Sequence, residues 1–229
     1  MSALFTRKAT QSAPRVELHP NLSKVLASIG YLIKIAERIP VRITQYDIVK
    51  SLFVAERAHL NNYGRPITYD NYMAMYHGPV PSLAYDFLKG NGSALRAYGL
   101  TDLPWTRTPA EHIGKGCYIY SEATTSDETL VLSPSDMSAL EAALKAVSNL
   151  SFGQVRKLTH NDPAYKEAWA AAGEKGSNPM SLGLLFDEPN FEAAKIVEFH
   201  SQQSAAREGA GDDFEIPADI EPYEVATDR

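Results

Sequence analysis

Residues 48–88 read IVKSLFVAERAHLNNYGRPITYDNYMAMYHGPVPSLAYDFL, and this stretch carries the strongest signals for the fold. Thr44 and Asp47, just before it, form a pair that resembles a capping box and predicts the start of a helix. Apolar residues then recur on one helical face from Ile48 onward. The helix is expected to end between residues 61 and 64, because asparagine and glycine tolerate the left-handed conformation found at helix ends.

Glycine and proline punctuate the second half of this stretch. Gly64 and Pro66 are expected to shape the turn out of the helix, because glycine permits a positive φ and proline fixes φ. Gly78 and Pro79 are expected to turn the chain toward the next helix. Residues 67–76, between these pairs, fit either an extended strand or a short helix, and we predict a short irregular element there.

Helical periodicity and capping signals continue on both sides of the stretch. Ser133 with Pro134, and Ser151 with Gln154, mark two helix starts. The predicted helices cover residues 22–36, 44–64, 82–89, 134–150, 151–159, 162–169 and 191–207. Residues 117–120 are a candidate strand, and residues 129–132 are its candidate partner across a wide hairpin.

These elements predict a mainly α (α+β) fold with six to seven helices and one small antiparallel β hairpin. We expect an irregular N-terminal segment at residues 1–20, a single helical domain at residues 21–207 and an acidic tail at residues 208–229. The chain is long enough to bury a sizeable core without a disulfide or a structural metal.

Composition excludes several classes of protein. The 229 residues are 44% apolar and 22% charged, which is typical of globular proteins. A lone cysteine, Cys117, excludes an intrachain disulfide and a zinc site built from several cysteines. No stretch approaches the roughly 18 consecutive apolar residues of a membrane span, and the first ten residues lack the apolar core of a secretory signal. We therefore expect a cytoplasmic protein that does not enter membranes.

Acidic residues are concentrated at the C-terminal end. The net charge is −6, and residues 208–229 hold eight acids and one base. The rest of the chain is nearly neutral, which argues against the broad basic surface that nucleic acid requires. The acidic tail is either a solvated, disordered end or a docking segment for a basic partner.

Few residues suggest catalysis or a metal. Glu56 and His59 are three residues apart on the predicted helix, but a carboxylate-bridged metal site needs a second such pair and more carboxylates. His160 and Asp162 have the spacing of a base and its orienting carboxylate, although a capping role for Asp162 is favoured. Cys117 is interpreted as a buried, inert thiol. We predict no catalytic residue, no metal and no cofactor.

Tyrosines cluster in the same part of the chain as the glycines and prolines. Five of the 12 tyrosines lie within 23 positions, at residues 63, 69, 72, 76 and 85. Together with Arg65 and two methionines, they have the composition of a recognition surface. The alternative is an aromatic core whose hydroxyls are hydrogen-bonded, and both can hold on opposite faces.

A series of residues in this region has the order and spacing of a known family signature. The residues are Leu52, Val54, Ala55, Glu56 and Arg57, then Tyr63, Gly64, Pro66, Ile67, Thr68 and Asp70, then Gly78, Pro79 and Val80, and downstream Leu132, Ser133, Leu158, Thr159, His160, Pro163, Tyr165 and Trp169. In this pattern the chain resembles the SocA-like antitoxin family, also called the Panacea domain, over about residues 22–172. The departures are one residue rather than two between Leu52 and Val54, residues 99–127, the chain after residue 178 and the acidic tail.

The resemblance implies a non-catalytic antitoxin that binds and neutralises a toxin protein encoded by an adjacent gene, with presentation to a cellular protease as a second route. Arg65, Tyr72, Tyr76 and His77 are predicted to contact the partner, because Arg and Tyr dominate interface hot spots. The alternative is that these residues only hold the fold. Asp70 is expected to cap the element that follows it.

Two other functions remain open. The chain is alternatively a phage or mobile-element protein that binds another host factor, and some members of the resembled family are carried on such elements. The second alternative is a hydrolase that uses His77 or His160.

Overall fold

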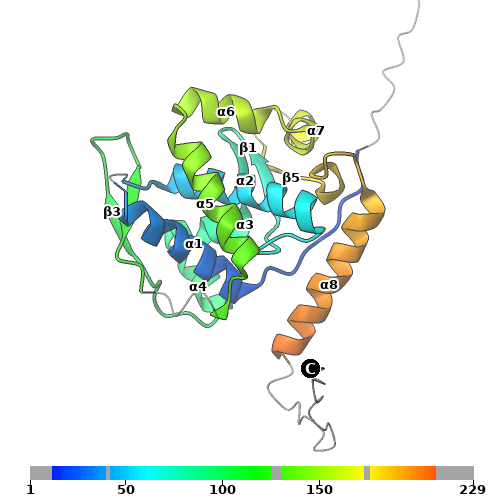
Figure 1. The fold of residues 1–229 in the computed structure, drawn as a ribbon, viewed down its shortest axis with the longest axis horizontal. Coiled ribbons are helices and arrows are strands. Elements are labelled where there is room, and N and C mark those ends of the chain that lie inside the picture. Colours follow the sequence, from blue (N-terminus) through cyan, green and yellow to red (C-terminus); the bar gives the residue numbers. More distant parts are fainter. Residues whose placement is uncertain (1–11, 40–41, 125–129, 173–175, 210–229) are drawn as a thin grey trace, which may run out of the picture.

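A computed structural model describes residues 12–39, 42–124, 130–172 and 176–209 (Figure 1). Among these residues there are eight α-helices and two small antiparallel sheets, which confirms a mainly α fold with some β structure. The helices are α1 (Leu22–Glu37), α2 (Gln45–Tyr63), α3 (Ser82–Lys89), α4 (Gly92–Ala97), α5 (Pro134–Ser148), α6 (Phe152–His160), α7 (Pro163–Ala172) and α8 (Phe191–Gly209), with a 3-10 helix η2 (Leu182–Leu184). The strands are β1 (Tyr72–Met75), β2 (Gly78–Pro81), β3 (Thr106–Pro109), β4 (Tyr118–Ser121) and β5 (Asn178–Pro179).

Local capping signals place most of the helix ends as predicted. Thr44 and Asp47 form a capping box at the start of α2, and Ser133 and Asp136 form another at the start of α5. α2 ends at Gly64, whose φ of 70° is left-handed. These helix ends are set by hydrogen bonds between residues that are close in the sequence, so they can be predicted from the sequence alone.

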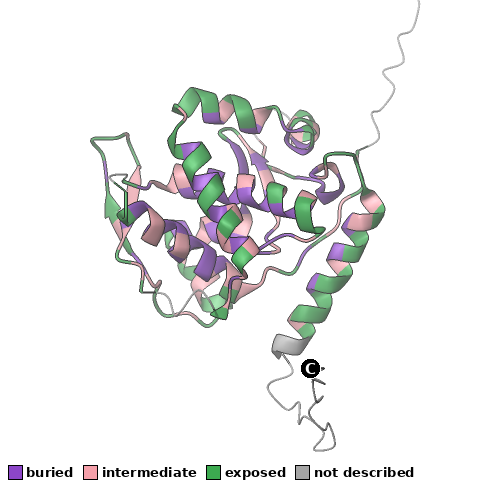
Figure 2. Cartoon of the chain, viewed as in Figure 1, coloured by how far each residue is buried: buried purple, intermediate pink, exposed green. Residues whose placement is uncertain are grey.

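α2 is the central helix, because two clusters of buried side chains pack on it. Val49 and Leu52 belong to the first cluster, which also includes residues of α1, α3 and α5. Phe53 and Leu60 belong to the second cluster, which includes residues of β1, α7 and α8. Figure 2 shows the buried residues gathered along these central elements, while α6 and α8 are exposed on their outer faces.

The larger sheet corrects the prediction for residues 67–76. β1 lies between β2 and β5, and all three strands are antiparallel, so the expected irregular element contains a strand. The turn predicted at Gly78 and Pro79 is instead the start of β2. Proline is disfavoured inside sheets because it lacks an N–H donor. Here β2 is an edge strand. The Ser82 N–H points toward β1, because it donates to the Asn71 carbonyl at 2.9 Å. Successive backbone nitrogens of a strand point in opposite directions, so the nitrogen of Pro79, three positions earlier, points away from β1.

The smaller sheet shows that the predicted hairpin partner is wrong. β4 pairs with β3, not with residues 129–132. On the opposite side of β4, the N–H of Tyr120 donates to the carbonyl of Ile43 at 3.1 Å. Both edges of β4 are therefore occupied. Residues 130–132 lie outside any strand, and residue 129 is not among the described residues.

α4 is an element that the sequence analysis did not anticipate. Gly90 ends α3 in the left-handed conformation, as glycine favours at that position. The Asn91 side chain then accepts a hydrogen bond from the Ser93 N–H at 3.0 Å and starts the six-residue α4. The described residues thus contain eight helices where six to seven were expected.

The two ends of the described chain lie side by side. Residues 12–20 are irregular, as predicted, and run between α8 and the rest of the molecule (Figure 1). The N–H of Glu17 donates to a carboxylate oxygen of Glu198 at 2.9 Å. α8 continues to Gly209, into the predicted acidic tail, and residues 210–229 of that tail lie outside the described residues. None of the described helices is long and apolar enough to cross a membrane.

Candidate partner-binding site

Glu56 of α2 holds the chain that leaves this helix. Its buried carboxylate accepts hydrogen bonds from the N–H of Ile67 at 2.5 Å and of Thr68 at 2.8 Å, and also from the Thr68 hydroxyl. Burial raises the pKa of Glu56, and the hydrogen bonds from Thr68 and Ile67 lower it in part. The carboxylate therefore pairs backbone N–H groups that would otherwise be buried without a partner.

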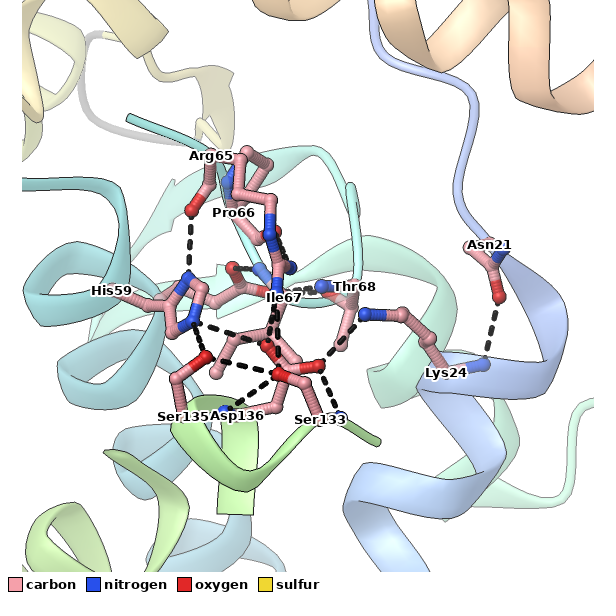
Figure 3. Close-up of polar contacts among 11 residues, drawn as sticks. Asn21, Lys24, His59, Arg65, Pro66, Ile67, Thr68, Ser133, Ser135 and Asp136 are labelled. Atoms are coloured by element: carbon pink, nitrogen blue, oxygen red, sulfur yellow. Dashed lines mark hydrogen bonds and ion pairs between the residues drawn. The ribbon is translucent and has the colours of Figure 1, made fainter. Parts of the chain in front are cut away.

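Asp136 at the start of α5 is the centre of a second group of polar contacts (Figure 3). Its fully buried carboxylate contacts Lys24 of α1 at 2.7 Å and Arg65 at 3.0 Å. Burial opposes ionisation, but the hydrogen bond from Lys24, together with the Ser133 N–H and the charge of Arg65, lowers the pKa of Asp136 below its usual value. This carboxylate thus ties α1, α5 and the chain after α2 together.

His59 of α2 completes this group. Burial lowers the pKa of His59. Its Nδ1 lies 2.9 Å from the carbonyl of Arg65, which requires Nδ1 to carry a proton. Its Nε2 lies 3.1 Å from the Ser135 hydroxyl and 3.1 Å from a carboxylate oxygen of Asp136. Glu56 and His59 are both buried, and both belong to hydrogen-bond groups that hold the fold.

Two other motif residues cap or fasten helices. Asp70 accepts hydrogen bonds from the N–H groups of Leu83 at 3.0 Å and Ala84 at 2.9 Å, and so caps α3 from a distant position in the sequence. Burial raises the pKa of Asp70 to about 7. Arg57 donates to Asp162 at 2.8 Å, and Asp162 itself caps the start of α7. These contacts give the motif residues structural roles.

The four residues predicted to contact a partner do not have the same environment. Tyr72 is only 7% exposed and packs against Phe53, so its predicted place on the partner surface is wrong. Its ring belongs to the core because alternate residues of β1 point inward. Arg65 is half-buried and turned toward Asp136. Tyr76 and His77, at the turn between β1 and β2, are exposed.

Tyr76 and His77 belong to an aromatic group that we call the hairpin-tip surface, formed by Tyr76, His77, Phe152, Arg156 and Trp169. The Tyr76 ring lies 4.9 Å from His77 and 6.4 Å from Trp169 of α7. The His77 ring lies 5.8 Å from Phe152, and the Arg156 guanidinium lies 5.4 Å from the centre of the Tyr76 ring, both from α6. Tyr76 is 64% exposed and Phe152 is 55% exposed.

The start of β2, directly after the turn of the hairpin, is held against α2 and α6. Gly78 has a φ of +103°, and a Cβ there would lie 2.8 Å from Nζ of Lys50 and from Oγ1 of Thr159. Lys50 is buried in α2 and donates to the carbonyl of Pro79 at 2.8 Å. Burial lowers the pKa of Lys50 to about 7. Gly78 and Pro79 thus permit the close approach that fixes the hairpin tip.

His160 lies behind the hairpin-tip surface. Its ring packs on Tyr165 with centroids 4.4 Å apart. Burial lowers the pKa of His160 to about 4, with a further contribution from the charges of Arg156, Lys50 and His77. Asp162 caps α7 and binds Arg57, so the structure does not pair His160 with that carboxylate. Within the described parts of the chain, no three His, Cys, Asp or Glu side chains gather as a metal site.

The remaining motif residues also take identifiable positions. Tyr63 is 60% exposed at the end of α2, where its ring lies 4.5 Å from that of His59. Pro66 is buried beside Ile67. Trp169 is half-buried and stacks on Tyr165 with an angle of 9° between the rings. Tyr63 therefore stands near the Asp136 group, while Trp169 belongs to the hairpin-tip surface.

A cavity of about 490 Å³ opens beside the hairpin tip. Tyr46, Lys50, Tyr76 and His77 are among the residues that line it. Cys117 also lines it and is partly exposed, which corrects the expectation of a buried thiol. The sequence analysis missed Lys50, although a lysine inside the apolar run IVKSLFVA is a signal for a buried amine.

Comparison with known proteins gives a match to a protein family. Neither the curated proteins nor the solved structures include a match to the chain. The family described as antitoxin SocA-like, Panacea domain, matches residues 48–166, which run from α2 into α7 and account for just over half of the chain. The chain therefore belongs to the SocA-like antitoxin family with a Panacea domain.

Proposed function

We propose that this protein is an antitoxin that neutralises a cognate toxin protein by binding it directly through the hairpin-tip surface. Membership in the SocA-like family supports a role in a toxin–antitoxin system. The observation that carries the binding proposal is the exposed aromatic group at the hairpin tip, with Tyr76 64% exposed and Phe152 55% exposed. Tyrosine, tryptophan and arginine are the residue types that dominate interface hot spots.

The contacts that hold the hairpin-tip surface in place support the same proposal. Lys50 and Gly78 hold the start of β2 next to the turn. Trp169 and Arg156 support the Tyr76 ring from the neighbouring helices. A surface that is ordered before binding loses less conformational entropy when the complex forms. The hairpin tip therefore offers a large contact area at a small entropic cost.

The motif residues support a role without catalysis. The side chains of Glu56, Arg57 and Asp70 bind backbone N–H groups or another side chain inside the fold. His160 has no orienting carboxylate among the described residues. We therefore propose that the protein acts by binding and not as an enzyme, and that a hydrolase based on His77 and His160 is disfavoured.

The proposal places the toxin gene beside the gene of this protein and places their encounter in the cytoplasm. The lone, partly exposed Cys117 is compatible with a reducing compartment. Presentation of the toxin to a cellular protease is a second route to the same outcome. A shorter half-life of the toxin in cells that contain this protein would favour that route over simple sequestration.

Co-expression tests the proposed function. The product of the adjacent gene is induced alone and together with this protein, and growth and co-purification are measured. The proposal predicts arrested growth with the neighbour alone, restored growth with both, and a complex that survives purification. A neighbour that is harmless, or one that remains toxic when both proteins are present, would contradict it.

A further inference from the structure

The cavity beside the hairpin has the size and walls of a small-molecule site. Its volume of about 490 Å³ lies within the range of about 300–1,000 Å³ that such sites occupy. The wall is mostly apolar and aromatic, with Val49, Met75, Tyr46, Tyr85 and Tyr118 among its residues. These rings leave space for a planar or apolar molecule between α2, the hairpin and the chain before β4.

Basic groups gather at this cavity without an acid to balance them. Lys50 and His77 line it, and Arg156 lies over the Tyr76 ring that also lines it. Among the described residues that line the cavity, none is aspartate or glutamate. A buried amine loses its hydration, so the charged form of Lys50 is unfavourable until an opposite charge enters.

One buried polar atom in the cavity wall, Oη of Tyr46, has no hydrogen-bond partner in the described parts of the chain. Lys50, also in the wall, uses one hydrogen bond, to Pro79, and a protonated amine offers three donors. Buried polar groups are normally paired, so these unused donors in the cavity wall indicate a ligand that supplies acceptors.

We propose that this cavity binds a small organic anion, whose carboxylate or phosphate group pairs with Lys50 and whose planar body lies against the tyrosines. The anion accepts hydrogen bonds from the Lys50 amine and the Tyr46 hydroxyl, and its charge stabilises the protonated amine. Such a ligand site goes beyond toxin neutralisation. Tyr76 and His77 belong both to the cavity wall and to the hairpin-tip surface, so an occupied cavity would touch the proposed toxin-binding residues from within.

Isothermal titration calorimetry on the full chain, without any toxin, tests this proposal. The probes are AMP, which joins a phosphate to a planar base, and benzoate, which joins a carboxylate to a ring. Adenosine and benzamide are their neutral counterparts. We expect at least one anion to bind with a Kd below about 1 mM and its neutral counterpart to bind at least about tenfold more weakly.

Matched variants locate the binding. Lys50→Met is expected to lower the affinity for the anion by about tenfold or more. Lys166→Met, the same change at an exposed lysine of α7, is expected to leave the affinity unchanged. If Lys50→Met fails to fold by circular dichroism, Tyr46→Phe takes its place, because its hydroxyl has no partner within the described chain. Tyr46→Phe is expected to weaken binding about threefold or more.

Three results would overturn the proposal. The first is that neither AMP nor benzoate binds. The second is that the neutral counterparts bind as tightly as the anions. The third is that a folded Lys50→Met variant, or Tyr46→Phe in its place, keeps the affinity of the parent protein. Because no toxin is present in these titrations, their outcome is independent of the test of the proposed function.

Discussion

The carboxylate of Glu56 shows how a single motif residue acts in this protein. It is buried in α2 and accepts hydrogen bonds from two backbone N–H groups and one hydroxyl of the chain that follows the helix. The residues that carry these donors, Ile67 and Thr68, are themselves buried. The residue therefore acts on the path of the backbone, and its removal should be felt as a loss of stability.

The substitution Glu56→Gln tests this role. The amide has one acceptor oxygen, so its NH2 group must face the N–H of Ile67 or Thr68, and two donors then lie opposite each other. We expect the free energy of unfolding in urea to fall by about 1–3 kcal/mol. Glu192→Gln, at a side chain that is 81% exposed, is the control and should change it by less than about 0.5 kcal/mol. Equal small effects would show that Glu56 is not a structural acceptor.

Lys50 predicts a characteristic pH dependence of stability. Its pKa is about 7 in the folded protein against an ordinary value of 10.5, because burial disfavours the charged amine. Between these values the unfolded chain binds more protons than the folded chain, so stability rises with pH. The titratable or charged groups near the amine are Tyr46 on its own helix, His77 on the hairpin, and Arg156 and His160 on α6.

The comparison with Lys50→Met isolates this contribution. Tyr46, with a pKa of about 12, and His160, with a pKa of about 4, do not titrate in the folded protein between about pH 7.5 and 9. Urea unfolding of the parent protein should show stability rising by about 1 kcal/mol per pH unit over this window, relative to the variant. Parallel pH profiles would mean that the amine keeps an ordinary pKa.

At the scale of residues, contacts between neighbours in the sequence are predictable and contacts between distant residues are not. Thr44 with Asp47, and Ser133 with Asp136, cap helices through neighbours three positions away, so their pattern is visible in the sequence. Asp136 also binds Lys24, more than a hundred positions away, and nothing local reveals that contact. For the same reason the cavity and its amine could not be derived before the fold was known.

At the scale of elements, all the helices except α4 were predicted, whereas among the strands only β4 was, and its partner was not. Helices here are set by periodicity and caps, whereas each strand depends on a partner elsewhere in the chain. β2 contains Pro79 and Pro81, which argue against a strand unless the strand is known to lie at an edge. β4 has its partners at residues 106–109 and at Ile43, and local pattern favoured the wrong neighbour.

The prediction at the scale of elements concerns the stability of a variant at Gly78. Its φ of +103° is unfavourable for any side chain, and a Cβ would approach Lys50 and Thr159 to 2.8 Å. We expect Gly78→Ala to lower the free energy of unfolding by about 1–3 kcal/mol in urea denaturation. Gly153→Ala in α6, where a Cβ meets nothing within 4 Å, is the control and should be neutral or stabilising. Equal effects at the two positions would contradict a strained, tightly packed backbone at the start of β2.

For the whole molecule, the matched family segment and the proposed binding surface coincide in part. Residues 48–166 include most of α2, the hairpin and α6, which supply Lys50, Gly78 and most of the hairpin-tip surface. Trp169 lies just beyond this segment, and α1 and α8 lie outside it. The fold class was predictable from the sequence, but the position of the binding surface depends on α6 and α7 meeting the hairpin in three dimensions.

The affinity of the toxin for two tyrosine variants tests the central claim most directly. Tyr76 at the hairpin tip is 64% exposed and Tyr63 at the end of α2 is 60% exposed, so the two alanine variants remove the same side chain at similar exposure. Calorimetric titration with the product of the adjacent gene should show Tyr76→Ala binding about tenfold or more weakly, and Tyr63→Ala binding like the parent. Unchanged affinity in Tyr76→Ala, or a loss confined to Tyr63→Ala, would contradict binding through the hairpin tip.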